Sequence, residues 1–371
     1  MIKQVCSRHF EDKTLHNYVT RHGELGECDY CNDGKERKVV DISDLGEFMQ
    51  DCLFQVYDDA ANWLPYDSRE GGYQGVTYET RELIEEYLDG DIDENVFTDL
   101  NYEIDDVAWC DYDPYGERHD ELLMQDWENF KTMIQHKQRF TIFQPKPIKP
   151  GRLKFSAADI LTELGKMILR FQMTKTISAG TIVYRCRQHE KDNITKASEM
   201  CSPSNEHAVY PNRMSPAGVS MFYGSLNQNT SALETINKLL ASKPYYSIAA
   251  FALKEDILVV DFSQLPKRPS IFNPHQFSKF HWVRFLENFV EDLSRKIKKD
   301  DKIEHVEYAP TQAVTEYIRF MLKTKGKDQI TGMIYPSSKD ASQNCLVLFY
   351  NHEESLEKLR FLPRRLLTTK I

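Results

Sequence analysis

The sequence predicts an α+β protein with more than one domain. Its 371 residues exceed the usual size of a single domain. Hydrophobic residues make up 41% of the chain and aromatic residues 12%, which excludes a mainly disordered protein because folded cores can form. Helix-like periodicity dominates the front part, whereas short β-rich runs alternate with helical stretches in the rear part. This change of pattern predicts a helical region followed by an α+β domain.

The net charge of −10 is unevenly distributed along the chain. Residues 41–120 contain 24 Asp and Glu but only three Lys and Arg, a local balance of −21, so the remainder sums to +11. The two parts are therefore expected to bind different partners or to face each other. The sequence leaves the oligomeric state open, a homo-oligomer included.

Hydropathy and cysteine content indicate the compartment. No run approaches 18 apolar residues, and the first 13 residues lack the apolar core of a secretory signal. We therefore expect a cytoplasmic protein with no membrane partner. Eight cysteines are too few for a disulfide scaffold in a chain of this length. Cys52, Cys110, Cys186 and Cys345 have apolar neighbours and are expected to pack as small hydrophobic side chains.

Residues 1–36 contain a pattern typical of zinc sites. Cys6 and His9 form one close pair, Cys28 and Cys31 form a second, and 18 residues separate the pairs. Four protein ligands leave no open position, so the predicted zinc is structural, and it would supply folding energy that this short segment lacks. Two alternatives are that these are ordinary thiols beside a chance histidine, or that His16 replaces His9.

Residues 37–150 are predicted to form a small, acidic, all-helical bundle. Leu45, Phe48, Met49, Cys52 and Leu53 recur at spacings of three and four, which indicates an amphipathic helix within residues 41–57. Further helices are expected at 80–88, 94–109 and 117–136.

A proline-rich segment marks the predicted domain boundary. Pro145, Pro147 and Pro150 disfavour both a helix and a central strand. The α+β domain then covers residues 151–371 and opens with a connecting helix at 157–171. Within it we expect strands at 180–185, 246–253, 257–262 and 345–349, and helices at 231–242, 282–298 and 311–324.

Several residues of this domain suit an anionic ligand. Arg185 lies at the end of an apolar strand, where a guanidinium group can bind phosphate oxygens, and Arg213 lies in a turn-rich loop. Tyr223, Glu234 and Ser337 follow at the ends of short strands or near a helix start. Each also has a structural explanation: Glu234 could complete a capping box with Ser231, Tyr223 could be core packing, and Ser337 could be a turn residue.

The order of these motifs resembles that of the RES domain family over about residues 175–350. The resemblance implies a compact fold akin to that of ADP-ribosyltransferases and an activity that consumes NAD, typically as a bacterial toxin. It places catalytic residues at Arg185, Glu234 and Ser337, with Arg213 and Tyr223 lining the NAD pocket. Arg187 is a competing assignment for the first arginine. The loop reads Asn-Arg-Met-Ser at 212–215, where the family usually has Gly-Arg-Trp-Asn, so the cofactor preference stays open.

The front half resembles the zinc-bearing region, related to HEPN helical bundles, that precedes some RES domains. Catalytic HEPN proteins carry an Arg-x4–6-His motif, and the predicted helices here contain none. We therefore expect a regulatory or recognition module, with an antitoxin or a trigger protein as a candidate partner.

The resulting hypothesis is cleavage of the nicotinamide–ribosyl bond of NAD, by hydrolysis or phosphorolysis, in a toxin or phage-defence effector that its front half regulates. Glu234 would stabilise the oxocarbenium-like ribose, Arg185 and Arg213 would hold the diphosphate, Tyr223 would contact nicotinamide, and Ser337 would fix the bound pose. One alternative is ADP-ribosylation of a protein target. Another is a zinc-containing nucleic-acid-binding module without catalysis, which the acidic front half disfavours because it repels phosphate backbones.

Overall fold

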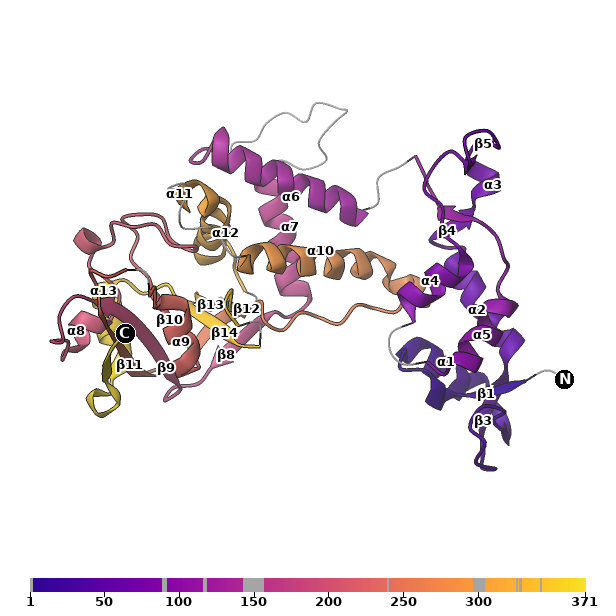
Figure 1. The fold of residues 1–371 in the computed structure, drawn as a ribbon, viewed down its shortest axis with the longest axis horizontal. Coiled ribbons are helices and arrows are strands. Elements are labelled where there is room, and N and C mark those ends of the chain that lie inside the picture. The colour runs from indigo at the N-terminus through magenta and orange to yellow at the C-terminus, as the bar shows by residue number, and fades with distance from the viewer. Residues whose placement is uncertain are drawn as a thin grey trace. The chain divides into compact units, whose positions relative to one another are not determined.

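The computed structural model describes residues 3–88, 92–115, 119–142, 157–238, 240–295, 304–324, 326, 329–340 and 342–371 (Figure 1). Contacts divide the chain into two compact units. The first comprises Met1–Glu121 and Lys267–Arg284, and the second comprises Leu122–Pro266 and Phe285–Ile371. The predicted proline-rich boundary at 144–152 lies outside the described residues.

The first unit opens with a small antiparallel sheet. Its strands β1 (Gln4–Cys6), β2 (Glu24–Glu27) and β3 (Glu36–Asp41) lie in the order β1-β3-β2. The turn η1 (Ser7–His9) and helix α1 (Lys13–His22) join β1 to β2. The Asp12 carboxylate accepts hydrogen bonds from two backbone amides and so begins α1, which buries Leu15 and Val19.

Three longer helices follow, near the predicted positions. They are α2 (Ile42–Leu53), α4 (Thr80–Tyr87) and α5 (Glu94–Glu103). The sequence pattern did not indicate several short elements between and after these helices. β4 (Tyr57–Asp59), after α2, pairs with β7 (Trp109–Asp111), after α5. α3 (Ala60–Trp63) precedes the paired strands β5 (Tyr66–Asp67) and β6 (Gly72–Tyr73). Each of these strands has only two or three residues, too few to show an alternating pattern.

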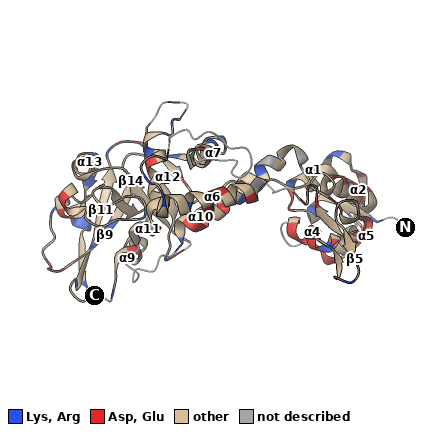
Figure 2. Cartoon of the chain, turned by 90° about the horizontal axis from the view of Figure 1, so that it is seen from above, with Lys and Arg blue, Asp and Glu red and all other residues tan. Residues whose placement is uncertain are grey.

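The core of the first unit combines distant parts of the sequence. Leu45 and Met49 of α2 pack with Trp109 and with Phe272, which comes from the 267–284 segment. The indole Nε1 of buried Trp109 donates to Thr80 Oγ1 at 2.9 Å, which fixes β7 against the start of α4. Figure 2 shows Asp and Glu recurring along the helices of this unit.

The second unit is built on a nine-stranded mixed sheet. Its order is β15-β11-β9-β10-β14-β13-β12-β8, and β16 also pairs with β11. The β12–β13 pair is parallel and the other pairs are antiparallel. The strands are β8 (Thr174–Ile177), β9 (Ile182–His189), β10 (Phe222–Ser225), β11 (Tyr245–Leu253), β12 (Ile257–Asp261), β13 (Ile330–Pro336), β14 (Asn344–Leu348), β15 (Leu359–Phe361) and β16 (Leu367–Lys370).

The sheet is accompanied by longer helices and short helical turns. The helices are α6 (His119–His136), α7 (Ala157–Arg170), α8 (Ala197–Met200), α9 (Gln228–Thr235), α10 (Phe277–Ser294), α11 (Glu304–Glu307), α12 (Ala309–Phe320) and α13 (His352–Lys358). The 3-10 turns of the second unit are η2 (Asn205–His207) and η5 (Pro363–Arg365), whereas η3 (Pro274–Gln276) lies in the first unit. α6 and α10 each begin in a segment assigned to the first unit and end in the second.

The α+β class predicted from the sequence is confirmed. The helix expected at 231–242 instead begins at Gln228, because the Asn227 side chain accepts hydrogen bonds from the amides of Asn229 and Thr230. Cys52, Cys110, Cys186 and Cys345 are buried, as expected. Cys201 is also buried. None of the described helices is long and apolar enough to cross a bilayer.

Candidate active site and metal centre

The candidate active site forms where strands β9 and β10 separate. The two strands pair only at Tyr184 and Ser225, although each is fully paired on its other edge. Gly224 permits this single close contact, because a Cβ atom there would lie 2.6 Å from the carbonyl oxygen of Tyr184. Beyond the contact the strands diverge, and side chains of both strands line the resulting cavity.

The cavity has a volume of about 570 Å³ and is strongly cationic. Four of the five pocket residues expected from the sequence line it, namely Arg185, Arg213, Tyr223 and Glu234. The described lining holds five Lys or Arg side chains and one carboxylate, that of Glu234. Such a cavity favours an anionic ligand that also presents a group able to interact with one negative charge.

Arg185 is enclosed at the base of the β9–β10 separation. Its Nη1 donates to the backbone oxygen of Tyr223 at 2.8 Å, and its guanidinium group lies 5.4 Å from the Phe222 ring centroid. Its Nε is buried without a hydrogen-bond partner among the described residues. Burial and the neighbouring Arg187 lower the pKa of Arg185 to about 10, so the group is still cationic at neutral pH. A partly exposed cation whose Nε–H is buried and unpaired is suited to an anionic ligand.

Arg187 and Arg213 have other hydrogen-bond partners. Arg187 is exposed and donates to the backbone oxygen of Glu199 at 2.6 Å. Arg213 donates to the backbone oxygens of Leu293 and Arg295, at 2.7 and 2.6 Å. Since both residues line the cavity, each can add positive charge to it, but the buried, unpaired donor is on Arg185.

Tyr223 presents a neutral phenol to the cavity. Its Oη forms a hydrogen bond with Ser215 Oγ at 2.9 Å, and burial raises its pKa above the ordinary value for tyrosine. The residue is therefore protonated at neutral pH and can act through its ring face and its hydroxyl group.

Glu234 is held by the turn that follows β13. Ser337 Oγ donates to Glu234 Oε1 at 2.5 Å, and Ser338 Oγ donates to Oε2 at 3.4 Å. The amides of Lys339 and Asp340 donate to Ser337 Oγ, both at 3.1 Å, which orients its proton towards the carboxylate. Ser337 is only 4% exposed and is not among the described lining residues, whereas Ser338 is. Ser337 therefore contacts the Glu234 carboxylate from the protein interior and does not line the cavity.

Glu234 does not form the capping box with Ser231 that was one explanation of its position. α9 begins after Asn227, so Glu234 lies in its last turn and Ser231 lies inside the helix. The carboxylate is thus free to interact with the Ser337 turn and the cavity.

Two thiols line the cavity but are poor nucleophiles. Burial and the nearby Glu234 carboxylate raise the pKa of Cys345 to about 12, and burial raises that of Cys186 to about 12. Both stay protonated at neutral pH, and only the thiolate is strongly nucleophilic.

Sequence reasoning did not identify several lining residues. Lys339 follows the Ser337–Ser338 pair directly, so its place in the same turn was a usable signal. Lys243, Ser294 and Tyr308 are distant in sequence from every motif. Only tertiary packing brings these three to the cavity.

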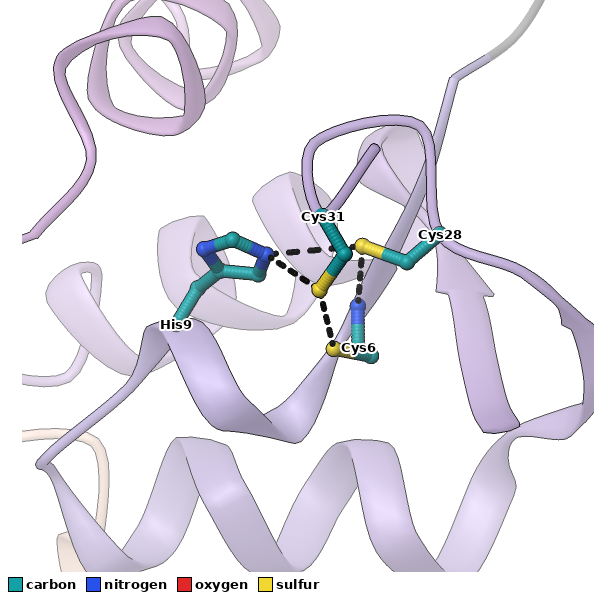
Figure 3. A group of neighbouring side chains, drawn as sticks. All are labelled: Cys6, His9, Cys28 and Cys31. Carbon is teal, nitrogen blue, oxygen red and sulfur yellow. Dashed lines mark hydrogen bonds between the residues drawn. The ribbon is translucent and has the colours of Figure 1, made fainter. Parts of the chain in front are cut away.

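The four predicted metal ligands form a second site, in the first unit (Figure 3). Cys6 ends β1, His9 lies in η1, and Cys28 and Cys31 follow β2. Their ligand atoms all lie within 4.8 Å of one another. His9 Nε2 is 3.4 Å from the sulfurs of both Cys28 and Cys31, and the Cys6 and Cys31 sulfurs are 3.5 Å apart.

This arrangement fits a tetrahedral zinc ion. Bond lengths of about 2.3 Å to sulfur and about 2.0 Å to nitrogen require ligand atoms to lie roughly 3.5 to 3.8 Å apart in a tetrahedron. The observed separations are close to that range, and the Cys6 amide donates to Cys28 Sγ at 3.4 Å, a contact that suits a thiolate. His16 lies on α1 outside this cluster.

Comparison with known proteins identifies both halves of the chain. The family model of HEPN/RES N-terminal domain 1 matches residues 21–148. The family model of the RES domain matches residues 182–367, half of the chain, and this range contains every residue of the candidate active site. No curated protein matches the chain at a significant level.

Proposed function

Because the chain belongs to the RES domain family, we propose that it degrades NAD by cleaving the bond between nicotinamide and ribose. The family is associated with NAD-related toxin activity. The observation that carries the proposal is the Glu234 carboxylate, held by Ser337 in a cavity whose other charged lining residues, among those that the structure describes, are cationic. NAD needs this combination, because it joins an anionic diphosphate to a ribose that becomes positively charged during cleavage.

Bond cleavage transfers the electron pair of the C1′–N bond to nicotinamide, which leaves as a neutral base. The ribose gains oxocarbenium character, and the Glu234 carboxylate stabilises that charge. Ser337 holds the carboxylate in place, which preserves its orientation without proton transfer. When water is the acceptor, its oxygen bonds to C1′ and one proton is released, giving ADP-ribose.

The diphosphate needs a cationic partner, and Arg185 is well suited to it. Its buried Nε–H has no partner among the described residues, so binding an anionic oxygen would satisfy an otherwise costly buried donor. Arg187 and Arg213 line the same cavity and add long-range attraction. The Tyr223 ring offers an aromatic face for the nicotinamide or adenine base.

Product analysis tests both the reaction and its acceptor. Purified protein is incubated with NAD in the presence and absence of inorganic phosphate, and the products are resolved by mass. ADP-ribose would indicate hydrolysis, its phosphorylated form would indicate phosphorolysis, and ADP-ribose attached to protein would indicate transfer. Intact NAD in all conditions, together with salt-sensitive binding of RNA or DNA, would instead support a nucleic-acid-binding module.

The metal centre is proposed to hold a structural zinc ion through Cys6, His9, Cys28 and Cys31. Three thiolates and one imidazole are a closed donor set, which suits a folding role and not catalysis. The ion would tie η1 and the turn after β2 to the small sheet that opens the first unit.

In the cell, this activity would make the protein a toxin or defence effector. Uncontrolled NAD loss would harm the host, so the N-terminal module is proposed to regulate it, alone or with an antitoxin or trigger protein. Expression of the wild-type chain in bacteria should lower cellular NAD and arrest growth, and Glu234→Gln should do neither. Growth arrest that persists in the variant with NAD unchanged would contradict this role.

A further inference from the structure

Arg213 is positioned by the end of a helix and not by its own loop. Its guanidinium group donates to the backbone oxygens of Leu293 and Arg295, where α10 ends. The last carbonyl groups of a helix have no partner within it, so an arginine that binds one in the last turn and one just beyond the helix is firmly anchored. The Tyr308 ring lies 5.7 Å from the same guanidinium group. The place of Arg213 in the cavity therefore depends on where α10 ends.

The same end of α10 is held by α6. Asp292 Oδ2 accepts a hydrogen bond from Trp127 Nε1 at 2.8 Å and forms an ion pair with Lys131 Nζ at 2.5 Å. The side chains of Asp292 and Lys131 are only 20% and 15% exposed, so this is not an ordinary surface ion pair. Trp127 is buried and packs edge-on against Phe289 of α10, with ring centroids 5.1 Å apart. α6 thus fixes the last turn of α10.

These contacts lie entirely within the second unit, although α6 belongs to the N-terminal family module. The HEPN/RES N-terminal domain 1 model covers residues 21–148, whereas chain contacts assign α6 from Leu122 onward to the unit that holds the cavity. The N-terminal module therefore contributes one helix to the unit that carries the candidate active site.

We propose that Trp127, Lys131 and Asp292 are positioning residues for Arg213, and that through them α6 tunes the affinity of the cavity for a dinucleotide diphosphate. The inference rests on the proposed function only for the identity of that ligand. The path consists of direct contacts: α6 holds Asp292, Asp292 lies in the last turn of α10, and the carbonyl groups at that end hold Arg213.

Two single variants of the full chain test the path. Trp127→Phe removes one donor and keeps a smaller aromatic ring, and Asp292→Asn removes the charge and keeps the size. Each should raise the KM for NAD about three- to ten-fold, with kcat within two-fold of wild type, because one charge-assisted contact is lost at a distance from the reacting bond. Glu128→Gln is the matched control, because Glu128 binds Lys131 at 2.7 Å but is 54% exposed, and it should leave KM unchanged.

Combination with Arg213→Met separates positioning from general destabilisation. In that background Asp292→Asn should cause no further increase in KM, because the group that it positions is gone. Equal increases with and without Arg213, or an unchanged KM in both single variants, would overturn the proposal.

A second readout does not require NAD. The losses in melting temperature caused by Asp292→Asn and Arg213→Met should be less than additive in the double variant, because both act on the end of α10. Additive losses would overturn the proposed coupling. If the wild type neither binds nor cleaves NAD while the losses are less than additive, the proposed function fails and the coupling of Asp292 to Arg213 stands.

Discussion

At the scale of single residues, the serine pair after β13 holds the Glu234 carboxylate, chiefly through Ser337. The Ser337 hydroxyl oxygen accepts hydrogen bonds from two backbone amides of its own turn, and the hydroxyl donates its proton to the Glu234 carboxylate. Ser338 reaches the same carboxylate at only 3.4 Å. The neighbouring serines therefore differ in strength of contact, and that difference can be measured.

We predict that Ser337→Ala lowers the kcat for NAD cleavage by about ten-fold or more, because a charge-assisted hydrogen bond of roughly 1.5 to 3 kcal/mol is lost. Ser338→Ala should change kcat less than about two-fold, because the contact that it removes is long. Steady-state kinetics with both variants checks this. Equal losses would mean that Ser337 does not orient Glu234.

A second prediction concerns Cys345, which lines the cavity. Burial and the Glu234 carboxylate raise its pKa to about 12, so at pH 8 nearly all of it is the unreactive thiol. Iodoacetamide at pH 8 should leave Cys345 unmodified in the folded protein and label it in urea, as mass spectrometry of peptides would show. Rapid labelling in the folded state would contradict the assigned environment and reopen a covalent thiol mechanism.

Residue types could be predicted from the sequence, but their contacts could not. The spacing of Cys6, His9, Cys28 and Cys31 predicted a cluster that the structure contains. The motifs also identified Arg185 and Glu234, both of which line the cavity. The hydrogen bond from Ser337 to Glu234 depends on where β13 ends relative to α9. This is a tertiary feature that no local sequence pattern indicates.

At the scale of elements, the β9–β10 separation creates the cavity, and the cluster of four predicted metal ligands brings η1 together with the turn after β2. Gly224 allows the single contact between the strands, and Asn32 and Gly34, with φ of 50° and 60°, form the left-handed turn after Cys31. The predicted helices in regions of strong periodicity lie close to α2, α4 and α7. The edge strands β8 and β16 are short and polar, so no alternating pattern revealed them.

Removal of the metal should destabilise the first unit. The sheet of β1, β2 and β3 is small, and the cluster Cys6, Cys28 and Val39 is separate from the main core of that unit. We predict one zinc per chain by elemental analysis, and a first thermal transition that falls by at least about 5 °C with a chelator. Cys28→Ser should lower this transition to a similar extent and abolish the chelator effect, whereas His16→Gln should do neither. An unchanged transition with the chelator would refute a structural metal.

At the scale of the whole molecule, the uneven charge gives an acidic first unit and a second unit with a cationic cavity. The acidic residues 41–120 all belong to the first unit, and the described lining of the cavity in the second unit has five cationic side chains and one carboxylate. The composition predicted two parts that bind different partners or face each other. It could not predict that α6 joins the second unit or that residues 267–284 join the first, because both exchanges depend on tertiary packing.

The central claim is that this cavity cleaves NAD with Glu234 as the stabilising carboxylate. The most direct measurement is nicotinamide release from NAD by the purified full chain, with Glu234→Gln and the exposed-site control Glu190→Gln alongside. We expect steady release by the wild type and by Glu190→Gln, and a rate at least about 100-fold lower for Glu234→Gln, since the loss of one preorganised charged group is that costly. Equal nicotinamide release by wild type and Glu234→Gln would contradict the account.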